Sequence, residues 1–445
     1  MKKIFTILFS FFSLFSFAQG HEKLRLDYFR MPENISAEDY LPQTIIIKLK
    51  PEFASKAKSR SVDIPALTKE LEGIGAISMA KRFQHVTAPT KRMNEKGEQM
   101  VDLSLIYEIV MDNSISLEKA INRLYRSDAI EYAEPFYLPQ TCFTPNDTSI
   151  GHQYALGMMK VFDAWGISQG DTNIVIGIVD TGVDFGHLDL VNNIKYNYND
   201  PINGVDDDGD GFIDNFHGWD LGENNNDPQV KPGSTHGIHV SGIAAASTNN
   251  TTGIAGVGFK CKFLPIKITN AAGALTRAYD GIIYAADQGC QVINCSWGSI
   301  AGGQFGQDVV NYAAVNKGAL VVAAAGNNDS EVDFFPAAYK NTLAVAATGN
   351  NDIRWGASNF GYYVDVCAPG ISIYSTVGDN NYEFLSGTSM SAPYAAGAAA
   401  LVKSHFPHYS AMQVAEQLKV TADNVNAKHS NLMEGKLGFG RINLF

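Results

Sequence analysis

The chain has 445 residues, of which 45% are hydrophobic and 18% are charged, so it can form two or three globular domains with sizeable cores. Its net charge of −12 includes no basic block, which argues against nucleic acid as a partner. The five cysteines are too few for a disulfide scaffold, and their number is odd. One pair could form a disulfide, although Cys295 and Cys367 lie in apolar runs and are expected to be buried thiols.

The first 18 residues have the pattern of a secretory signal peptide. Lys2 and Lys3 precede an apolar stretch from Ile4 to Phe17, and the small residues Ser16 and Ala18 fit cleavage after Ala18. The stretch is too short for a membrane span, which needs about 20 apolar residues, and no later segment is long and apolar enough. We therefore expect a secreted protein, extracellular or periplasmic, with no membrane partner.

Residues 19–140 are predicted to form a separate small α+β unit. Their apolar patterns give strands and helices in the order β-α-β-β-α-β, which indicates a ferredoxin-like sandwich. The polar stretch 141–150 contains a Pro-Asn-Asp turn signal and is interpreted as a linker. The strands are expected at 44–49, 77–83, 103–111 and 130–135, and the helices at 64–71 and 116–125.

Residues 151–445 alternate between apolar runs of strand length and longer segments with helical spacing. This alternation implies an α/β fold in which a parallel sheet is covered by helices on both faces. A ligand site then belongs at the carboxyl ends of the strands. The strands are expected at 173–179, 262–268, 292–295, 320–325 and 343–347, and the helices at 236–246, 275–288, 306–315, 389–404 and 412–420.

Three short stretches of this second part carry candidate catalytic residues. Ser389 stands at the start of an alanine-rich helix, beside free backbone N–H groups, although serine is also a preferred helix cap. Asp180 ends a buried apolar run, and His236 opens another helix of small residues. A serine hydroxyl needs a base to take its proton, and the base needs a carboxylate to hold its tautomer. The order Asp180, His236, Ser389 is one of the known chain orders of that triad.

These stretches resemble the motifs of the subtilisin-like serine peptidases, the subtilases. The sequence departs from those motifs at Ile238, where threonine is usual, and at Ser391, where alanine is usual; neither is a reacting group. The resemblance covers about residues 150–445. It implies a three-layer subtilisin-like fold and a monomeric serine endopeptidase that cuts protein or peptide substrates through an acyl-enzyme. The matching motifs are Asp180-Thr181-Gly182, His236-Gly237-Ile238-His239 and Gly387-Thr388-Ser389-Met390-Ser391-Ala392-Pro393.

The resemblance also implies an oxyanion hole. The stretch 321–327 is similar to the subtilase strand that ends in an Ala-Ala-Gly-Asn sequence, so the Asn327 amide and the Ser389 backbone N–H are expected to stabilise the oxyanion. The alternative is that Asn327 is only a turn residue.

Substrate binding is expected beside Ser389. The stretch 294–298 resembles the subtilase strand that pairs with an extended peptide. Phe334 falls where the family has the base of the S1 pocket, and a phenylalanine there is expected to disfavour large aromatic P1 residues; the alternative is core packing. The residues expected to line S1 are Ser296, Trp297 and Gly298 together with Ala325 and Gly326 in the stretch 323–326.

Calcium (Ca2+) is the expected structural cofactor, at two places. The first resembles a subtilase calcium site and would use Gln153, Asp189 and Asn250. The second is an acidic loop whose oxygens alternate around a turn glycine, as in an EF-hand. His217 stands where the EF-hand glutamate should be, so the loop is not an EF-hand. The alternative to a calcium site is a solvated acidic loop. The carboxylates of this loop are Asp206, Asp208, Asp210 and Asp214.

The position of residues 19–140 directly before a subtilase-like domain implies an inhibitory propeptide. Its tail, 134–139, would lie in the substrate cleft and be cut autocatalytically. The alternative is a permanent N-terminal binding domain. The sequence does not separate a broad digestive peptidase from one that processes a single partner. An inactive binding module is disfavoured because every reacting group is present.

Overall fold

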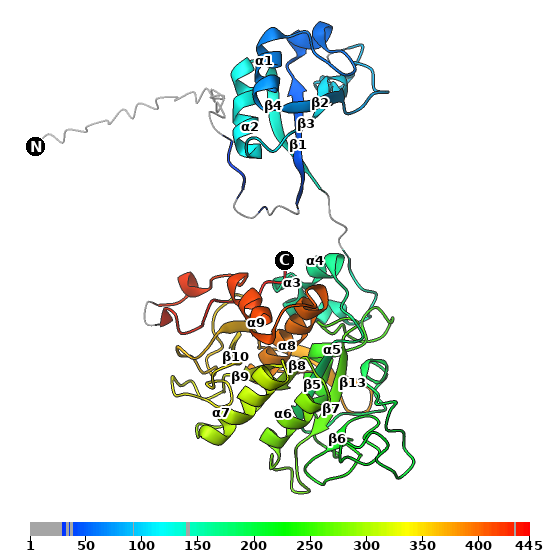
Figure 1. Cartoon of the computed structure of the whole chain (residues 1–445), viewed down its shortest axis with the longest axis vertical. Coiled ribbons are helices and arrows are strands. Elements are labelled where there is room, and N and C mark those ends of the chain that lie inside the picture. Colours follow the sequence, from blue (N-terminus) through cyan, green and yellow to red (C-terminus); the bar gives the residue numbers. More distant parts are fainter. Residues whose placement is uncertain (1–28, 33–34, 36–38, 92, 139–142, 431–432) are drawn as a thin grey trace, which may run out of the picture. The chain divides into compact units, whose positions relative to one another are not determined.

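The computed structural model describes residues 29–32, 35, 39–91, 93–138, 143–430 and 433–445 (Figure 1). The predicted signal peptide and Cys142 therefore lie outside the described residues. The chain divides into two compact units, Met1–Gln140 and Thr141–Phe445. No helix among the described residues is long and apolar enough to cross a membrane.

The first unit is an antiparallel four-stranded sheet with the order β2-β3-β1-β4, covered on one face by two helices. Alternate residues of β1, Ile45 and Ile47, are fully buried against Ile121 of α2, because every second residue of a strand faces the same side. The predicted element order and the ferredoxin-like arrangement are found. The elements are β1 (Tyr40–Leu49), α1 (Pro65–Gly73), β2 (Ala76–Lys81), β3 (Ile106–Met111), α2 (Leu117–Leu124) and β4 (Ile130–Tyr137).

The second unit is built on a seven-stranded parallel sheet with the order β11-β10-β9-β8-β5-β7-β6. All five predicted strands belong to it, while β6, β11 and the separate hairpin β12–β13 were not predicted. The strands are β5 (Val175–Asp180), β6 (Trp219–Asp220), β7 (Lys262–Lys267), β8 (Val292–Cys295), β9 (Leu320–Ala324), β10 (Thr342–Thr348), β11 (Val366–Pro369), β12 (Ile373–Val377) and β13 (Asn381–Leu385).

Helices cover both faces of this sheet, which confirms the predicted three-layer α/β architecture. In β5, Ile176 and Ile178 belong to the core formed with α5 and α8, whereas Val175 and Val179 belong to the core formed with α6 and α7. A strand that is apolar at every position therefore has a buried side chain on each face. The helices are α3 (Tyr154–Met158), α4 (Val161–Ile167), α5 (His236–Ala245), α6 (Ala278–Asp287), α7 (Gln304–Asn311), α8 (Thr388–His405) and α9 (Ala411–Val420).

Helix α8 is deeply buried near the predicted site, with every residue from Met390 to Leu401 buried. At Gly397 the helix has no room for a side chain, since an added Cβ would lie 2.7 Å from Cβ of Val257 and 2.9 Å from the carbonyl oxygen of Ala244. Small residues along α8 thus allow close packing against its neighbours.

The cysteines that the structure describes are all buried free thiols, as expected for Cys295 and Cys367. The four are Cys261, Cys290, Cys295 and Cys367.

Candidate active site

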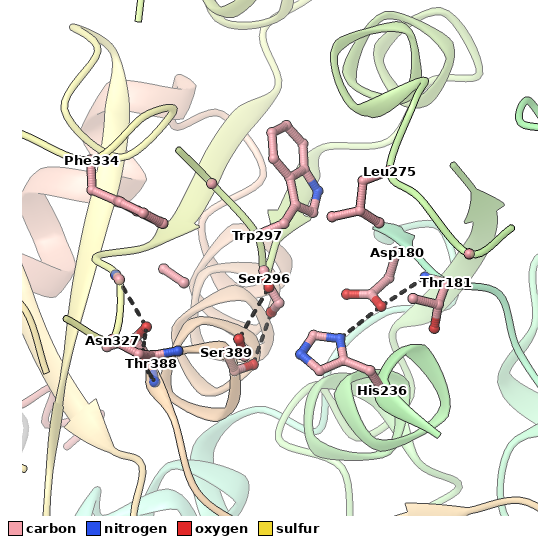
Figure 2. A pocket seen from close by; sticks show the side chains of 14 residues that line it. Asp180, Thr181, His236, Leu275, Ser296, Trp297, Asn327, Phe334, Thr388 and Ser389 are labelled. Atoms are coloured by element: carbon pink, nitrogen blue, oxygen red, sulfur yellow. Dashed lines mark hydrogen bonds and ion pairs between the residues drawn. The ribbon is translucent and has the colours of Figure 1, made fainter. Parts of the chain in front are cut away.

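The predicted catalytic and substrate-binding residues meet at the carboxyl edge of the parallel sheet. Three neighbouring strands end at this edge. Strand β5 ends at Asp180, β8 ends just before Ser296, and β9 ends just before the loop that contains Asn327. Two helices begin at the same edge, with His236 as the first residue of α5 and Ser389 as the second residue of α8. Figure 2 shows these side chains around one cleft.

Asp180 and His236 form a short, directed contact. The Nδ1 atom of His236 lies 2.8 Å from Oδ1 of Asp180, and the backbone N–H of Thr181 donates to the same oxygen at 2.7 Å. Asp180 is only 2% exposed. Its carboxylate raises the pKa of His236 above the ordinary histidine value. The contact therefore holds the imidazole so that Nε2 is available toward the cleft.

Ser389 is held by Ser296 through a reciprocal pair of hydrogen bonds (Figure 2). The Ser389 hydroxyl donates to the Ser296 carbonyl oxygen at 3.1 Å, and the Ser296 hydroxyl donates to the Ser389 carbonyl oxygen at 2.9 Å. In the expected triad the Ser389 hydroxyl would leave this carbonyl and turn to His236 in order to react. Such contacts are often made fully only when substrate is bound.

The amide of Asn327 is oriented by Thr388. Its Oδ1 accepts hydrogen bonds from the Thr388 backbone N–H at 2.9 Å and from the Thr388 hydroxyl at 2.8 Å. Because the oxygen is engaged, the Nδ2 donor is the free end of the side chain. A methyl group built on Gly387 would lie 3.6 Å from both Asn327 Nδ2 and the Ser389 backbone N, so both expected oxyanion donors flank one small space. This role of Thr388 was not predicted, although Thr388 lies within the serine motif, next to Ser389.

The cleft has a volume of about 420 Å³. Phe334 lies in it as predicted, with its ring against two glycines: an added Cβ would be 2.3 Å from the ring at Gly298 and 2.9 Å from it at Gly326. The Trp297 indole donates from Nε1 to the Val179 carbonyl oxygen at 2.9 Å. The residues that line the cleft are Asp180, Thr181, His236, Gly273, Leu275, Ser296, Trp297, Gly298, Ala324, Gly326, Asn327, Phe334, Thr388 and Ser389.

Ala325 was predicted to line the cleft and does not. It is fully buried in a separate core with Val364 and Cys367, whereas Ala324, in the same predicted stretch 323–326, does line the cleft. Successive residues of an extended chain point to opposite sides, so only one of two neighbouring alanines can face substrate. Leu275 and Gly273, which were not predicted, belong to the lining of the cleft.

The first predicted calcium site brings together part of the expected set of residues. Both ends of the Gln153 amide are bound to the Ala255 backbone at 2.8 Å, so its oxygen already accepts one hydrogen bond. Asp189 and Asn250 do meet, with the amide 2.7 Å from the carboxylate, and Asp147 binds the same loop through the Asn250 N–H at 3.4 Å. Asp147 is 3% exposed and had been interpreted only as part of a turn.

Burial dominates the electrostatics of this site. It raises the pKa of Asp189 to about 6 and also raises the pKa of Asp147. Neither carboxylate forms an ion pair within the part of the chain that the structure describes.

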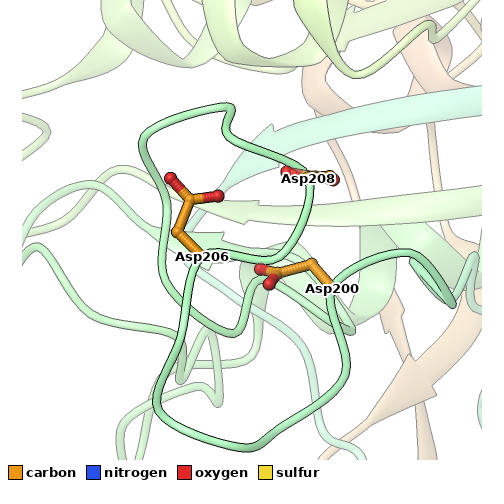
Figure 3. Close-up of side chains that lie close together, drawn as sticks. All are labelled: Asp200, Asp206 and Asp208. Atoms are coloured by element: carbon orange, nitrogen blue, oxygen red, sulfur yellow. The ribbon is translucent and has the colours of Figure 1, made fainter.

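The acidic loop also differs from the prediction. Asp206 and Asp208 are joined by Asp200, and one carboxylate oxygen of each lies within 4.8 Å of the others (Figure 3). Asp210 accepts hydrogen bonds from the Asn215 and Gln288 amides, and Asp214 accepts from the backbone N–H groups of residues 203 and 204. The EF-hand pattern therefore does not describe how these carboxylates are grouped.

Comparison with known proteins agrees with this geometry. The family model described as the subtilase family matches residues 171–440. The chain belongs to the subtilase family. The thermophilic serine proteinase of Bacillus sp. (strain AK1) is 36% identical over 394 residues, which cover 88% of each chain. Thermitase of Thermoactinomyces vulgaris is 39% identical over 298 residues, covering 66% of this chain and 97% of thermitase.

Among solved structures, a protease of Pseudoalteromonas arctica PAMC 21717 matches this subtilase with a TM-score of 0.56 and 29% sequence identity. The match covers 68% of this chain and 98% of that one. These relatives are proteases, and this subtilase is a serine endopeptidase. Relatives from Natrialba magadii and Xanthomonas campestris are named as extracellular proteases.

The raised pKa of His236 predicts a specific pH dependence of this subtilase. A catalytic base must be neutral to accept a proton. We therefore expect kcat/KM to rise with pH around a midpoint above the ordinary histidine pKa of about 6.5. In Asp180→Asn the charge that raises the pKa is gone, so the midpoint should fall and kcat should drop roughly 10⁴-fold. The measurement is a pH profile on a chromogenic peptide.

Asp163→Asn on the surface of α4 is the control for this experiment and should leave the midpoint unchanged. A wild-type midpoint below 6.5, or the same midpoint in Asp180→Asn, would contradict the pairing of Asp180 with the catalytic base.

Proposed function

We propose that this subtilase is a secreted endopeptidase that uses Asp180, His236 and Ser389 as its catalytic triad and removes its own N-terminal unit. The observation that supports this most directly is the 2.8 Å contact between His236 Nδ1 and Asp180 Oδ1 beside a cleft that Ser389 also lines. A base that is held by a buried carboxylate next to a serine at a helix N-terminus is suited to acyl transfer.

In the proposed mechanism His236 takes the proton of the Ser389 hydroxyl as the oxygen attacks the scissile carbonyl. Asp180 remains ionised, keeps the imidazole in one tautomer and stabilises the imidazolium. The Asn327 amide and the Ser389 backbone N–H donate to the oxyanion; loss of one such donor lowers kcat about 10²–10³-fold in subtilisin. His236 then protonates the leaving amine, and water repeats these steps to release the acid.

The N-terminal unit is proposed to be a propeptide. It is a compact body with its own core, joined to the protease unit near residue 140, and it follows a segment with the pattern of a signal peptide. A separate unit in this place can assist folding and block the cleft until it is cut. The extracellular relatives support secretion.

Intact mass after expression of the full chain tests both proposals. Wild type should lose about residues 19–140, and Ser389→Ala should keep them, because only the serine nucleophile is missing. Ser391→Ala is the matched control, since its hydroxyl donates to the Ala368 carbonyl oxygen at 3.0 Å within the core and does not line the cleft. It should be processed like wild type.

Two other outcomes would each remove one part of the proposal. If wild type keeps the unit but hydrolyses casein, the N-terminal unit is a permanent domain. If it keeps the unit and is inactive, the chain is a binding module on a peptidase scaffold.

Phe334 is proposed to limit the depth of the S1 pocket. Its ring fills space beside Gly298 and Gly326, so the wild-type enzyme should disfavour phenylalanine and tyrosine at P1. Phe334→Ala should raise kcat/KM for P1 phenylalanine about 10–100-fold relative to P1 alanine. Cleavage of a peptide library by both enzymes measures this, with the P1 alanine peptides as the internal control. A wild-type preference for phenylalanine at P1 would contradict the assignment.

Calcium is proposed as a structural ion. Asp147 and Asp189, with Asn250, would hold it at the first place, where two buried carboxylates in one group suit a hard cation with oxygen ligands. Asp200, Asp206 and Asp208 would hold it at the second. At both places the ion would supply positive charge that offsets repulsion between carboxylates.

Removal of calcium should therefore lower the melting temperature of the protease. An ion that binds only the folded state stabilises it by mass action. We expect the melting temperature to be about 5–10 °C higher in excess calcium than in a chelator. In Asp189→Asn most of this difference should disappear. Asp308→Asn on the exposed part of α7 is the control and should keep it. Equal melting temperatures for wild type in calcium and in chelator would contradict a bound ion.

A further inference from the structure

A buried asparagine, Asn359, lies behind the loop that carries the expected oxyanion donor. It is 0% exposed, does not line the cleft, and belongs to the segment between β10 and β11. No motif in the sequence pointed to it. Its hydrogen bonds to more distant segments go to the loop that follows β9.

Asn359 binds the peptide groups on both sides of Asn327. Its backbone N–H donates to the Gly326 carbonyl oxygen at 2.8 Å, which fixes the peptide group before Asn327. Its side-chain Oδ1 accepts the Asn328 N–H at 2.8 Å, which fixes the peptide group after Asn327, and the Ser330 N–H at 3.3 Å. The two soft backbone dihedrals of Asn327 lie between these anchored groups.

The contact with Gly326 is too close for any side chain at that position. A Cβ on Gly326 would lie 2.4 Å from Asn359 Nδ2, and Gly326 has φ of +100°, which only glycine adopts readily. Among the described residues the nitrogen forms no hydrogen bond of ordinary geometry, although the Tyr363 hydroxyl interacts with the same side chain. The side chain thus acts here through its oxygen, and its amide nitrogen is packed against the glycine turn.

Two residues therefore divide the task of aiming the Asn327 amide. Thr388 fixes the end of the side chain, because it donates twice to Oδ1 (Figure 2). Asn359 fixes the backbone from which that side chain extends. When both ends are fixed, the Nδ2 atom of Asn327 is directed toward the space that the backbone N of Ser389 also borders.

We propose that Asn359 is a positioning residue for the oxyanion hole, which acts on the rate only through the placement of Asn327. This inference rests on the proposed oxyanion role of Asn327. A donor that is already oriented costs no reorganisation when charge develops on the carbonyl oxygen. A displacement of about 1 Å can cost 10²-fold in rate, so a loosened loop has a measurable effect.

A double-mutant cycle separates positioning from general damage to the fold. Asn359→Ala should lower kcat about 10-fold or more with little change in KM, because the lost interaction is one made in the transition state. In an Asn327→Ala background the same change should lower kcat less than about 2-fold, since there is no amide left to position. All variants are made from the full chain, and kcat is normalised to titrated active sites on a chromogenic peptide.

The controls keep each outcome informative. Asn351→Ala, on an exposed turn outside the cleft, should leave kcat unchanged. If Asn359→Ala does not yield folded enzyme, Asn359→Ser, which leaves less space unfilled, replaces it in the same cycle. A loss of kcat that is equal in both backgrounds would overturn the inference and leave Asn359 with a structural role only. If Asn327→Ala alone costs nothing, the oxyanion assignment fails instead, which is a separate result.

Discussion

The packing of α8 against its neighbours is the constraint on which the active site depends. At Gly397 the helix approaches the segments that contain Val257 and Ala244 with no space for even a methyl group. This fixes where the helix lies, and hence where its first turn presents Ser389 and Thr388. Ser389 then meets Ser296 after β8, and Thr388 meets Asn327 after β9. A contact about two turns away from Ser389 thus sets the position of Ser389 and of Thr388, which orients Asn327.

The electrostatics of the site follow from the edge of the sheet. The carboxyl ends of parallel strands meet there, so polar residues in the loops after them are brought together without unpaired backbone in the core. Asp180 tolerates 2% exposure because Thr181 N–H and His236 both face its Oδ1 oxygen. Beside it, Lys267 at the end of β7 pairs with buried Asp220 at 2.6 Å. Each of these two buried carboxylates is thus held by a specific partner.

The sequence predicted the structure best where a functional motif or an apolar strand consists of a few neighbouring residues. The surroundings of Asp180, His236 and Ser389 and the long apolar strands such as β5 are local patterns, and these elements lie where they were expected. Short strands were missed: β6 has two residues, and β11 consists of Val366–Pro369, which no periodicity can identify. Their pairing depends on neighbours far away in the chain. The same holds for Asp147, which contacts a loop about 100 residues further along the chain. Asp200 is close to Asp206 in the chain but lies outside the stretch in which the oxygens alternate.

Neighbouring positions were also hard to rank. Ala324 and Ala325 are the same residue type in one strand end, and only the pleat of the backbone decides which of them faces the cleft. Asn359 could not be found from residue type alone, because a buried asparagine after an apolar strand has no local signature. Its importance lies in pairing with residues 326–330, which is a property of the folded chain.

A protease can be cut by other copies of itself, and the burial of α8 affects how easily this helix can be cut. A peptide bond is cut when its segment can open and extend into a cleft, and segments within a dense core open only when much of the molecule unfolds. Residues 390–401 of α8 are all buried, so one molecule offers another no accessible segment within this part of the helix. Autolysis within α8 therefore requires extensive unfolding of the enzyme.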